Sequence, residues 1–85
     1  MDVRIALDAQ LKFERLPVLV KLRMLNIFER LARWPDVSGA KPLRGALAGQ
    51  YRIRTGDYRV QFRVDAGGIV VLKVGHREGF YDEQR

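Results

Sequence analysis

The chain opens with a strand-like pattern that soon gives way to helical spacing. Residues 3–7 are rich in apolar and β-branched side chains, which predicts a short first strand. Asp8 is a favourable helix N-cap residue, so a short helix is expected over residues 9–15. Pro17 interrupts that helix and suits the first turn of another. A second helix is therefore predicted over residues 17–33, ending before the next proline.

The second predicted helix is apolar over an unusually wide arc. At about 100° per residue its apolar side chains cover roughly 220°, more than a helix needs to pack on one sheet. One side carries Val18, Leu22, Leu25, Phe28 and Ala32, and the arc is extended by Val20, Met24, Ile27 and Leu31. We interpret the extending residues as a surface for a partner. A fully buried helix is the alternative.

The second half of the chain changes to the pattern of β-strands. Residues 36–50 contain several glycines and no clear period, so they are expected to form a loop with one helical turn. Residues 51–54 and 58–64 alternate apolar with mostly basic side chains. The tripeptide Thr55-Gly-Asp57 separates them, which predicts a β-hairpin.

A further turn and a last strand complete the predicted sheet. Asp65-Ala-Gly-Gly68 supplies turn residues, and residues 69–74 are apolar and β-branched. The order of elements predicts an α+β fold, in which an N-terminal strand and two helices pack on an antiparallel β-sheet. The 85 residues contain no repeat or linker, so we expect a single domain over residues 1–85.

The composition of the chain limits the cellular compartment in which it is expected and the chemical class of its binding partner. The chain has no cysteine, which fits a reducing compartment, and its first apolar run is too short for a signal peptide or a membrane span. We therefore expect a cytoplasmic protein with no membrane partner. The net charge of +6 favours polyanionic partners. Charge alone leaves RNA, DNA and an acidic protein open.

Arginines concentrate in the predicted hairpin. Strand alternation places its apolar side chains in the core and leaves a second set on the opposite face, namely Arg52, Arg54, Arg59, Gln61 and Arg63. Folding gives no obvious reason to gather guanidinium groups, whereas a phosphodiester matches their fork of donors. A solvated strand face is the plain alternative.

The residues after the last predicted strand add groups that transfer protons. RNA is cut without a metal when its 2′-hydroxyl attacks the neighbouring phosphate, cations hold the charge and the leaving oxygen is protonated. His76 is able to act as base or acid, and Arg77 and Tyr81 lie beside it in sequence. A structural histidine and a packing tyrosine are the alternatives. One histidine and no cysteine predict no metal site, and we expect no cofactor.

Four motifs, in this order, resemble the RelE/ParE toxin superfamily of type II toxin–antitoxin systems, particularly its RelE-like branch. They are Lys41-Pro-Leu-Arg-Gly45, Gly49-Gln-Tyr-Arg-Ile-Arg54, Gly56-Asp-Tyr-Arg-Val60, and Val74-Gly-His-Arg77 with Tyr81. Together they cover about half of the chain. The resemblance implies a microbial-ribonuclease-like fold whose curved sheet holds mRNA in the ribosomal A site.

The resemblance also implies roles for individual residues. Arg59 and Arg77 would stabilise the charged transition state, and Tyr81, His76 or both would handle protons. A further set would bind and orient the RNA backbone, namely Arg52, Arg54, Arg44 and Arg63. The family often carries lysine at the first two positions of this set. Because arginine transfers protons poorly, this departure weakens Arg52 and Arg54 as candidates for the base and favours His76 instead.

The implied activity is a metal-independent, ribosome-dependent mRNA endonuclease that inhibits translation. Its implied partners are the ribosome, mRNA and a cognate antitoxin, with operator DNA bound only through the toxin–antitoxin complex. The antitoxin would cover the arc around Val20, Met24, Ile27 and Leu31. A ParE-like DNA gyrase inhibitor without nuclease activity and an inactive regulatory paralogue are the alternatives. The arginine-rich strands favour the nuclease.

Overall fold

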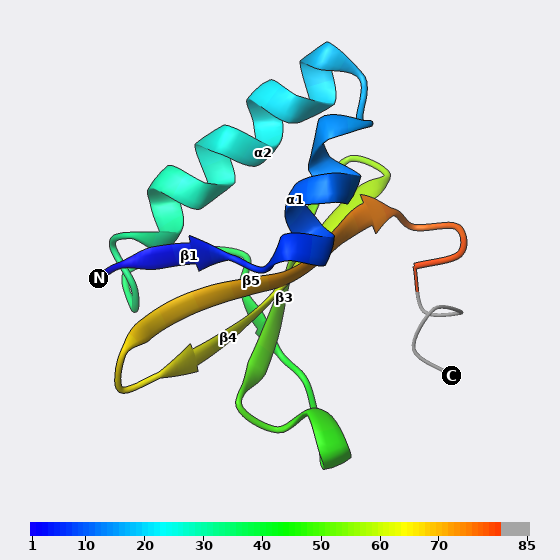
Figure 1. Cartoon of the computed structure of the whole chain (residues 1–85). Coiled ribbons are helices and arrows are strands. Elements are labelled where there is room, and N and C mark those ends of the chain that lie inside the picture. Colours follow the sequence, from blue (N-terminus) through cyan, green and yellow to red (C-terminus); the bar gives the residue numbers. More distant parts are fainter. Residues whose placement is uncertain (81–85) are drawn as a thin grey trace.

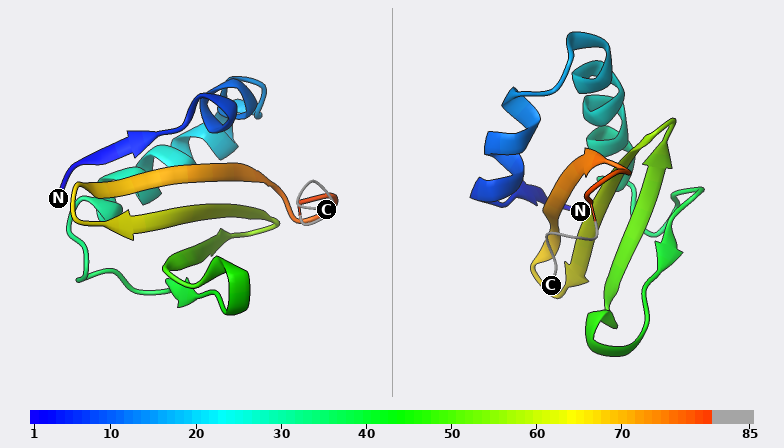
Figure 2. Two further views of the ribbon diagram at one scale, coloured as in Figure 1. Left: turned by 60° about the horizontal axis from the view of Figure 1, so that its bottom comes forward. Right: turned by 90° about the vertical axis from the view of Figure 1, so that its right-hand side faces the viewer.

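In the computed structural model, which describes residues 1–80, two helices lie on one face of a five-stranded β-sheet (Figure 1). The helices are α1 (Leu7–Glu14) and α2 (Val18–Leu31). The strands are β1 (Val3–Ile5), β2 (Lys41–Pro42), β3 (Gln50–Thr55), β4 (Tyr58–Asp65) and β5 (Gly68–His76), and a short 3-10 helix, η1 (Gly45–Leu47), precedes β3. Figure 2 shows both helices on the same side, so neither covers the other side of the sheet.

The strand order in the sheet is β1-β5-β4-β3-β2. The strands from β2 to β5 pair in antiparallel fashion. β1 instead pairs in parallel with β5, with Val3 opposite Ile69. Both helices follow β1 in the chain and precede the antiparallel strands. The predicted α+β fold is confirmed, and its sheet is mixed because β1 joins in parallel.

The N-terminal boundaries differ slightly from the predicted ones. β1 ends at Ile5, and α1 begins at Leu7 with Ala6 as its N-cap. Asp8 therefore lies in the first helical turn and is not the cap, although a carboxylate there still interacts favourably with the helix dipole. Pro17 is the N-cap of α2, where its missing N–H leaves no helical hydrogen bond unmade.

The hydrophobic core lies between α2 and the sheet. The buried residues of α2 are Val20, Met24, Ile27, Phe28 and Leu31. They belong to one cluster with the buried strand residues Ile53, Val60, Phe62, Ile69, Val71 and Val74. Met24 and Leu31 are 0% exposed, so this side of α2 faces the sheet. The interpretation of the arc around Val20, Met24, Ile27 and Leu31 as a partner surface is therefore wrong.

The other side of α2 carries the surplus apolar side chains. We call this group the apolar helix surface: Val18, Leu19, Leu22 and Leu25, which are 47 to 71% exposed. Steps of about 100° per residue place it nearly opposite the buried set. The wide apolar arc predicted from the sequence is thus present, but the residues expected to face a partner are in the core, and of the other side Val18, Leu22 and Leu25 are exposed whereas Phe28 is buried.

An irregular pairing of β4 and β5 decides which side chains of β5 face the helices. Phe62 lies opposite Val71. The preceding residue of β4, Gln61, lies opposite Lys73, which leaves Leu72 as the extra residue of a bulge. Side chains alternate between the two faces, and one extra residue reverses the alternation. Lys73 therefore faces away from the helices.

The segment predicted as a loop contains more structure than expected. Besides the expected helical turn, η1, it forms β2 at the sheet edge, where the missing N–H of Pro42 is tolerated. Trp34 connects the end of α2 to the sheet, and the Trp34–Pro35 peptide bond is cis. The Trp34 ring lies 4.7 Å from that of Tyr51 and 5.5 Å from that of Phe62.

Candidate nucleic-acid interface

The face of the sheet away from the helices is basic, as the alternation predicted. Lys41 lies opposite Arg52 across β2 and β3, and Arg54 lies opposite Arg59 across β3 and β4. Cross-strand side-chain pairs typically contribute roughly 0.2–1 kcal/mol, and like charges directly opposite one another destabilise the strand pair. An anionic ligand would remove this repulsion. We call the whole group the basic face: Lys41, Arg52, Arg54, Arg59, Arg63 and Lys73.

The β3–β4 turn brings three of the predicted site residues to one end of the sheet. Arg54 and Arg59 flank this turn. The backbone N–H of Arg77 donates to the carbonyl oxygen of Asp57 at 2.7 Å, and its Nε lies 3.9 Å from Asp57 Oδ1. Exposed ion pairs of this kind are weak. A phosphate placed here is therefore able to displace the carboxylate.

The opposite end of β4 is electrostatically different. Arg63 Nε lies 3.3 Å from Asp65 Oδ2, and Asp65 Oδ1 accepts a hydrogen bond from Gly67 N–H at 2.8 Å. This backbone hydrogen bond, helped by Arg63 and Arg4, lowers the pKa of Asp65 below its ordinary value. Arg63 thus has a carboxylate partner already, and less of its charge is available to an RNA phosphate.

A neutral amide lies in the middle of the basic face. Gln61 is 4% exposed and lies between Arg52 on β3 and Lys73 on β5. Its Nε2 donates to Oε1 of Gln50 on the neighbouring strand. Gln61 therefore keeps its predicted place on this face, where it separates two cations of the same cross-strand row.

Two lysines that sequence reasoning missed reach the same region. Lys73 comes to this face through the bulge, and its Nζ lies 4.4 Å from the centroid of the Phe80 ring. Lys12 extends from α1 to the end of β5, because a Cβ on Gly75 would lie 3.6 Å from Lys12 Cε and from Phe80 Cδ1. Gly75 lies opposite Arg59, so both lysines approach Arg59. No local sequence signal connects Lys12 to the strands.

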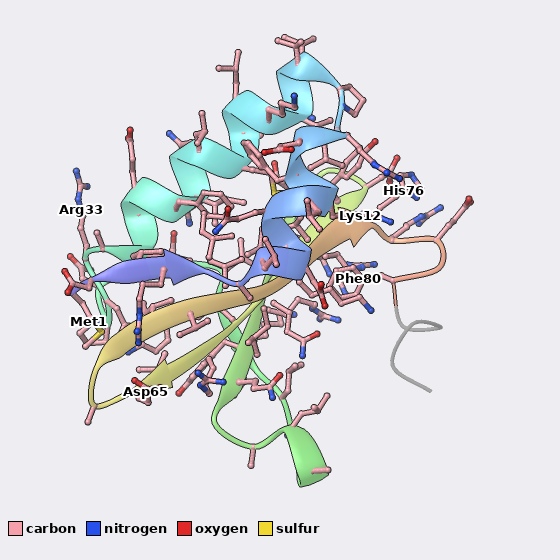
Figure 3. The ribbon with its side chains drawn as sticks, viewed as in Figure 1. Met1, Lys12, Arg33, Asp65, His76 and Phe80 are labelled. Carbon is pink, nitrogen blue, oxygen red and sulfur yellow. The ribbon has the colours of Figure 1, made fainter. Side chains whose placement is uncertain are left out.

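The structure separates His76 from the basic face. Its ring packs edge-on to Tyr58, with centroids 5.1 Å apart, and its Nδ1 accepts a hydrogen bond from Glu78 N–H at 3.1 Å. Figure 3 shows His76 and Phe80 on opposite sides of the end of β5. Because Arg59 lies on the Phe80 side, the sheet backbone stands between Arg59 and His76. A catalytic role for His76 stays a prediction.

The remaining predicted residues lie at the periphery. Arg44 is exposed just before η1, and Tyr81 lies outside the described residues. Within residues 1–80, no three acidic or histidine side chains are grouped so that they could hold a metal ion. Neither described helix is long and apolar enough to cross a membrane.

Comparison with known proteins agrees with this fold. A family model described as the ParE toxin of the type II toxin–antitoxin system, parDE, matches residues 3–81. Over 82 residues the chain is 35% identical to Toxin RelG of Mycobacterium tuberculosis, covering 93% of each protein.

Solved structures show the same architecture. The toxin–antitoxin complex RelBE2 of M. tuberculosis contains a chain of 33% identity and TM-score 0.75, with 88% of this chain and 95% of that chain covered. The RelB–RelE complex of Methanococcus jannaschii contains one of 24% identity and TM-score 0.80, with 96% and 99% covered. The second match speaks for the fold alone.

The fold, two helices on a mixed sheet, and the matches to known proteins together place this chain in the class of small toxins found in type II toxin–antitoxin systems. The chain belongs to the RelE/ParE toxin superfamily, and it is a RelBE-like toxin.

Proposed function

We propose that this toxin is a metal-independent, ribosome-dependent mRNA endonuclease that inhibits translation in the cytoplasm. The observation that carries the proposal is the direct opposition of Arg54 and Arg59 on a sheet face that neither helix covers. Such a pair is unfavourable in the free protein and favourable against a polyanion. Guanidinium groups also match phosphate oxygens in geometry.

In the proposed reaction the RNA 2′-hydroxyl attacks the adjacent phosphorus and the bond to the 5′-oxygen breaks. Negative charge grows on the non-bridging oxygens, where Arg59 and Arg77 stabilise it. Tyr81 is our proposed base for the 2′-hydroxyl proton, and His76 is the weaker candidate because it lies on the helix side. The RNA backbone is held by Arg52 and Arg54, with smaller shares from Arg44 and the already paired Arg63.

The test is primer-extension mapping of mRNA on ribosomes incubated with the purified toxin. We expect cuts within A-site codons. Removing one transition-state donor costs roughly 10²–10³-fold in rate, so Arg59→Ala should be slower by about that factor. Arg33→Ala, beyond the end of α2, is the matched control and should cut normally. Undiminished cleavage by Arg59→Ala would exclude the assigned role.

A second function has one observation in its favour, since the matching family model is described as a ParE toxin. A ParE-like gyrase inhibitor would leave mRNA intact and inhibit DNA supercoiling in a purified assay. A protein that does neither would be the inactive regulatory paralogue. The opposed arginines favour the nuclease because a protein that only binds gyrase needs no site for a phosphate.

The proposed inhibitory partner is a cognate antitoxin, as in the complexes of the similar toxins. The apolar helix surface replaces the buried arc as its proposed docking site, because its four side chains are exposed. An amphipathic antitoxin segment would bury them, and the toxin's charge of +6 favours an acidic one. Operator DNA is proposed to bind only through the toxin–antitoxin complex.

A further inference from the structure

We propose that a cavity at the end of β5 binds one nucleotide of the mRNA, the nucleotide next to the phosphate held by Arg59 and Arg77, and that His76 selects its base. The inference rests on the proposed nuclease function and deepens it by naming a site for substrate selection. It starts from the cavity, which the proposed reaction does not use, and from the histidine in its wall.

The cavity has the size and the lining of a site for one base. Its volume is about 200 Å³. Sites for drug-sized ligands occupy roughly 300–1,000 Å³, so this smaller cavity accommodates a single flat ring system. Its apolar and aromatic lining comprises Leu16, Pro17, Tyr58 and Phe80. Unpaired RNA bases bind to proteins by stacking on such side chains and by hydrogen bonds from their edges, and an mRNA strand offers bases of this kind.

The cavity adjoins the residues that are proposed to hold the scissile phosphate. His76 and Glu78 line it and flank Arg77 in the chain. The backbone N–H of Arg77 donates to the carbonyl oxygen of Asp57 at 2.7 Å, and the residue after Asp57 is Tyr58, which also lines the cavity. A phosphate bound at Arg77 therefore lies close to the cavity, and we place the neighbouring nucleotide in it.

Residues from both sides of the sheet line the cavity. Tyr58 and His76 lie on the helix side, whereas Lys73 and Phe80 lie on the side of the basic face. Figure 3 shows His76 and Phe80 on the two sides of the end of β5. The strand backbone that separates His76 from Arg59 ends here, so an RNA chain is able to pass round the end of β5 from the basic face into the cavity.

His76 and Glu78 supply the hydrogen-bonding groups that distinguish one base from another. The His76 ring is edge-on to that of Tyr58, at an interplanar angle of 89°, and its Nδ1 accepts a hydrogen bond from Glu78 N–H at 3.1 Å. In the neutral imidazole this bond leaves the proton on Nε2, which is then a donor. The Glu78 carboxylate offers acceptors. Because the bases differ in the order of donors and acceptors along their edges, this pair favours some bases over others.

The rim of the cavity carries positive charge for the phosphate of the bound nucleotide. Lys12 and Arg15 line the cavity and are exposed. Among the described residues that line it, Glu78 is the only acidic one, and Lys73 is a third cation. A strand that enters the cavity therefore meets a net positive surface, which favours its phosphates.

The first test measures base preference. Ribosomes carrying mRNAs that differ only in the bases on either side of the cut are incubated with the toxin, and single-turnover cleavage is followed. His76→Phe keeps a ring against Tyr58 and removes both nitrogen atoms. We expect the wild type to favour some bases on one side of the cut. His76→Phe should reduce that preference by about 2- to 10-fold, which corresponds to the loss of one hydrogen bond. Its rate on the least favoured base should stay at the wild-type value.

The second test measures the charge at the rim. Arg15→Gln should weaken the apparent affinity of the toxin for all of these mRNAs equally, because a phosphate contact carries no base information. The slope of log affinity against log salt concentration should become shallower by roughly 0.7–1, the value for one lost phosphate contact. Arg33→Gln removes the same charge beyond the end of α2 and should leave the slope unchanged.

The outcomes separate this inference from the nuclease itself. Thermal melting checks that each variant is folded, and if His76→Phe does not fold, the exposed Arg15→Gln decides alone, with an unchanged salt slope counting against the site. Equal losses on all bases with His76→Phe would make His76 a proton-transfer group and overturn base selection. A wild-type toxin that cuts every mRNA at the same rate would also overturn it and leave the nuclease intact. A wild-type toxin that cuts none of them would overturn both.

Discussion

The two exposed surfaces of this toxin differ in what holds their side chains in place. The basic face is spread over four strands, and its cations keep their positions through the register of β2 to β5. The apolar helix surface lies on α2 alone, on the side that the core does not use. A surface held by backbone register suits chemistry that needs fixed positions. Surplus apolar area on one helix suits a protein partner.

The largest expected effect separates the two sides of α2. Met24→Ala opens a cavity in the core and should lower the free energy of unfolding by about 2–5 kcal/mol. Leu22→Ala removes an exposed side chain and should change it by no more than about 0.5 kcal/mol. Urea unfolding of both variants measures the difference. Equal losses would mean that the apolar helix surface is buried in the free toxin.

An intermediate effect is expected when the apolar helix surface is made acidic. Leu22→Glu puts a charge where the proposed antitoxin segment docks. We expect the affinity for the antitoxin to fall by roughly tenfold or more, which corresponds to a loss of about 1.4 kcal/mol or more. Isothermal titration calorimetry with the antitoxin measures the change. Ala66→Glu adds the same charge in the exposed β4–β5 turn and controls for net charge. Unchanged affinity with Leu22→Glu would remove this surface from the docking site.

The smallest effect concerns the end of the basic face that already has a carboxylate. The pKa of Asp65 is lowered in the folded state, so its ionised form stabilises the fold at neutral pH. That contribution should be lost as the pH falls through the folded pKa, below the ordinary aspartate range. Thermal melting of the wild type and Asp65→Asn should therefore show a small gap at pH 7 that closes at low pH. A gap independent of pH would show that charge plays no part.

Alternation of apolar and basic residues was enough to predict the hairpin of β3 and β4 and the side of the sheet on which its arginines lie. A period of two leaves only two choices of face, and the buried Ile53, Val60 and Phe62 decide between them. The same reasoning failed on α2, where both sides are apolar. Which side of such a helix meets the core depends on the sheet that it packs against, and periodicity does not contain that information.

The sequence by itself therefore determined the class of fold, the arginine-rich face and the family motifs, since these depend on local spacing and residue type. Only the tertiary structure decided which groups join Arg59. An unbroken alternation from Val71 would have put Lys73 in the core, and the bulge at Leu72 turned it to the basic face. Lys12 and His76 were likewise placed by packing, Lys12 toward Gly75 and His76 against Tyr58. Bulges and packing arise between elements far apart in sequence, so no local pattern records them.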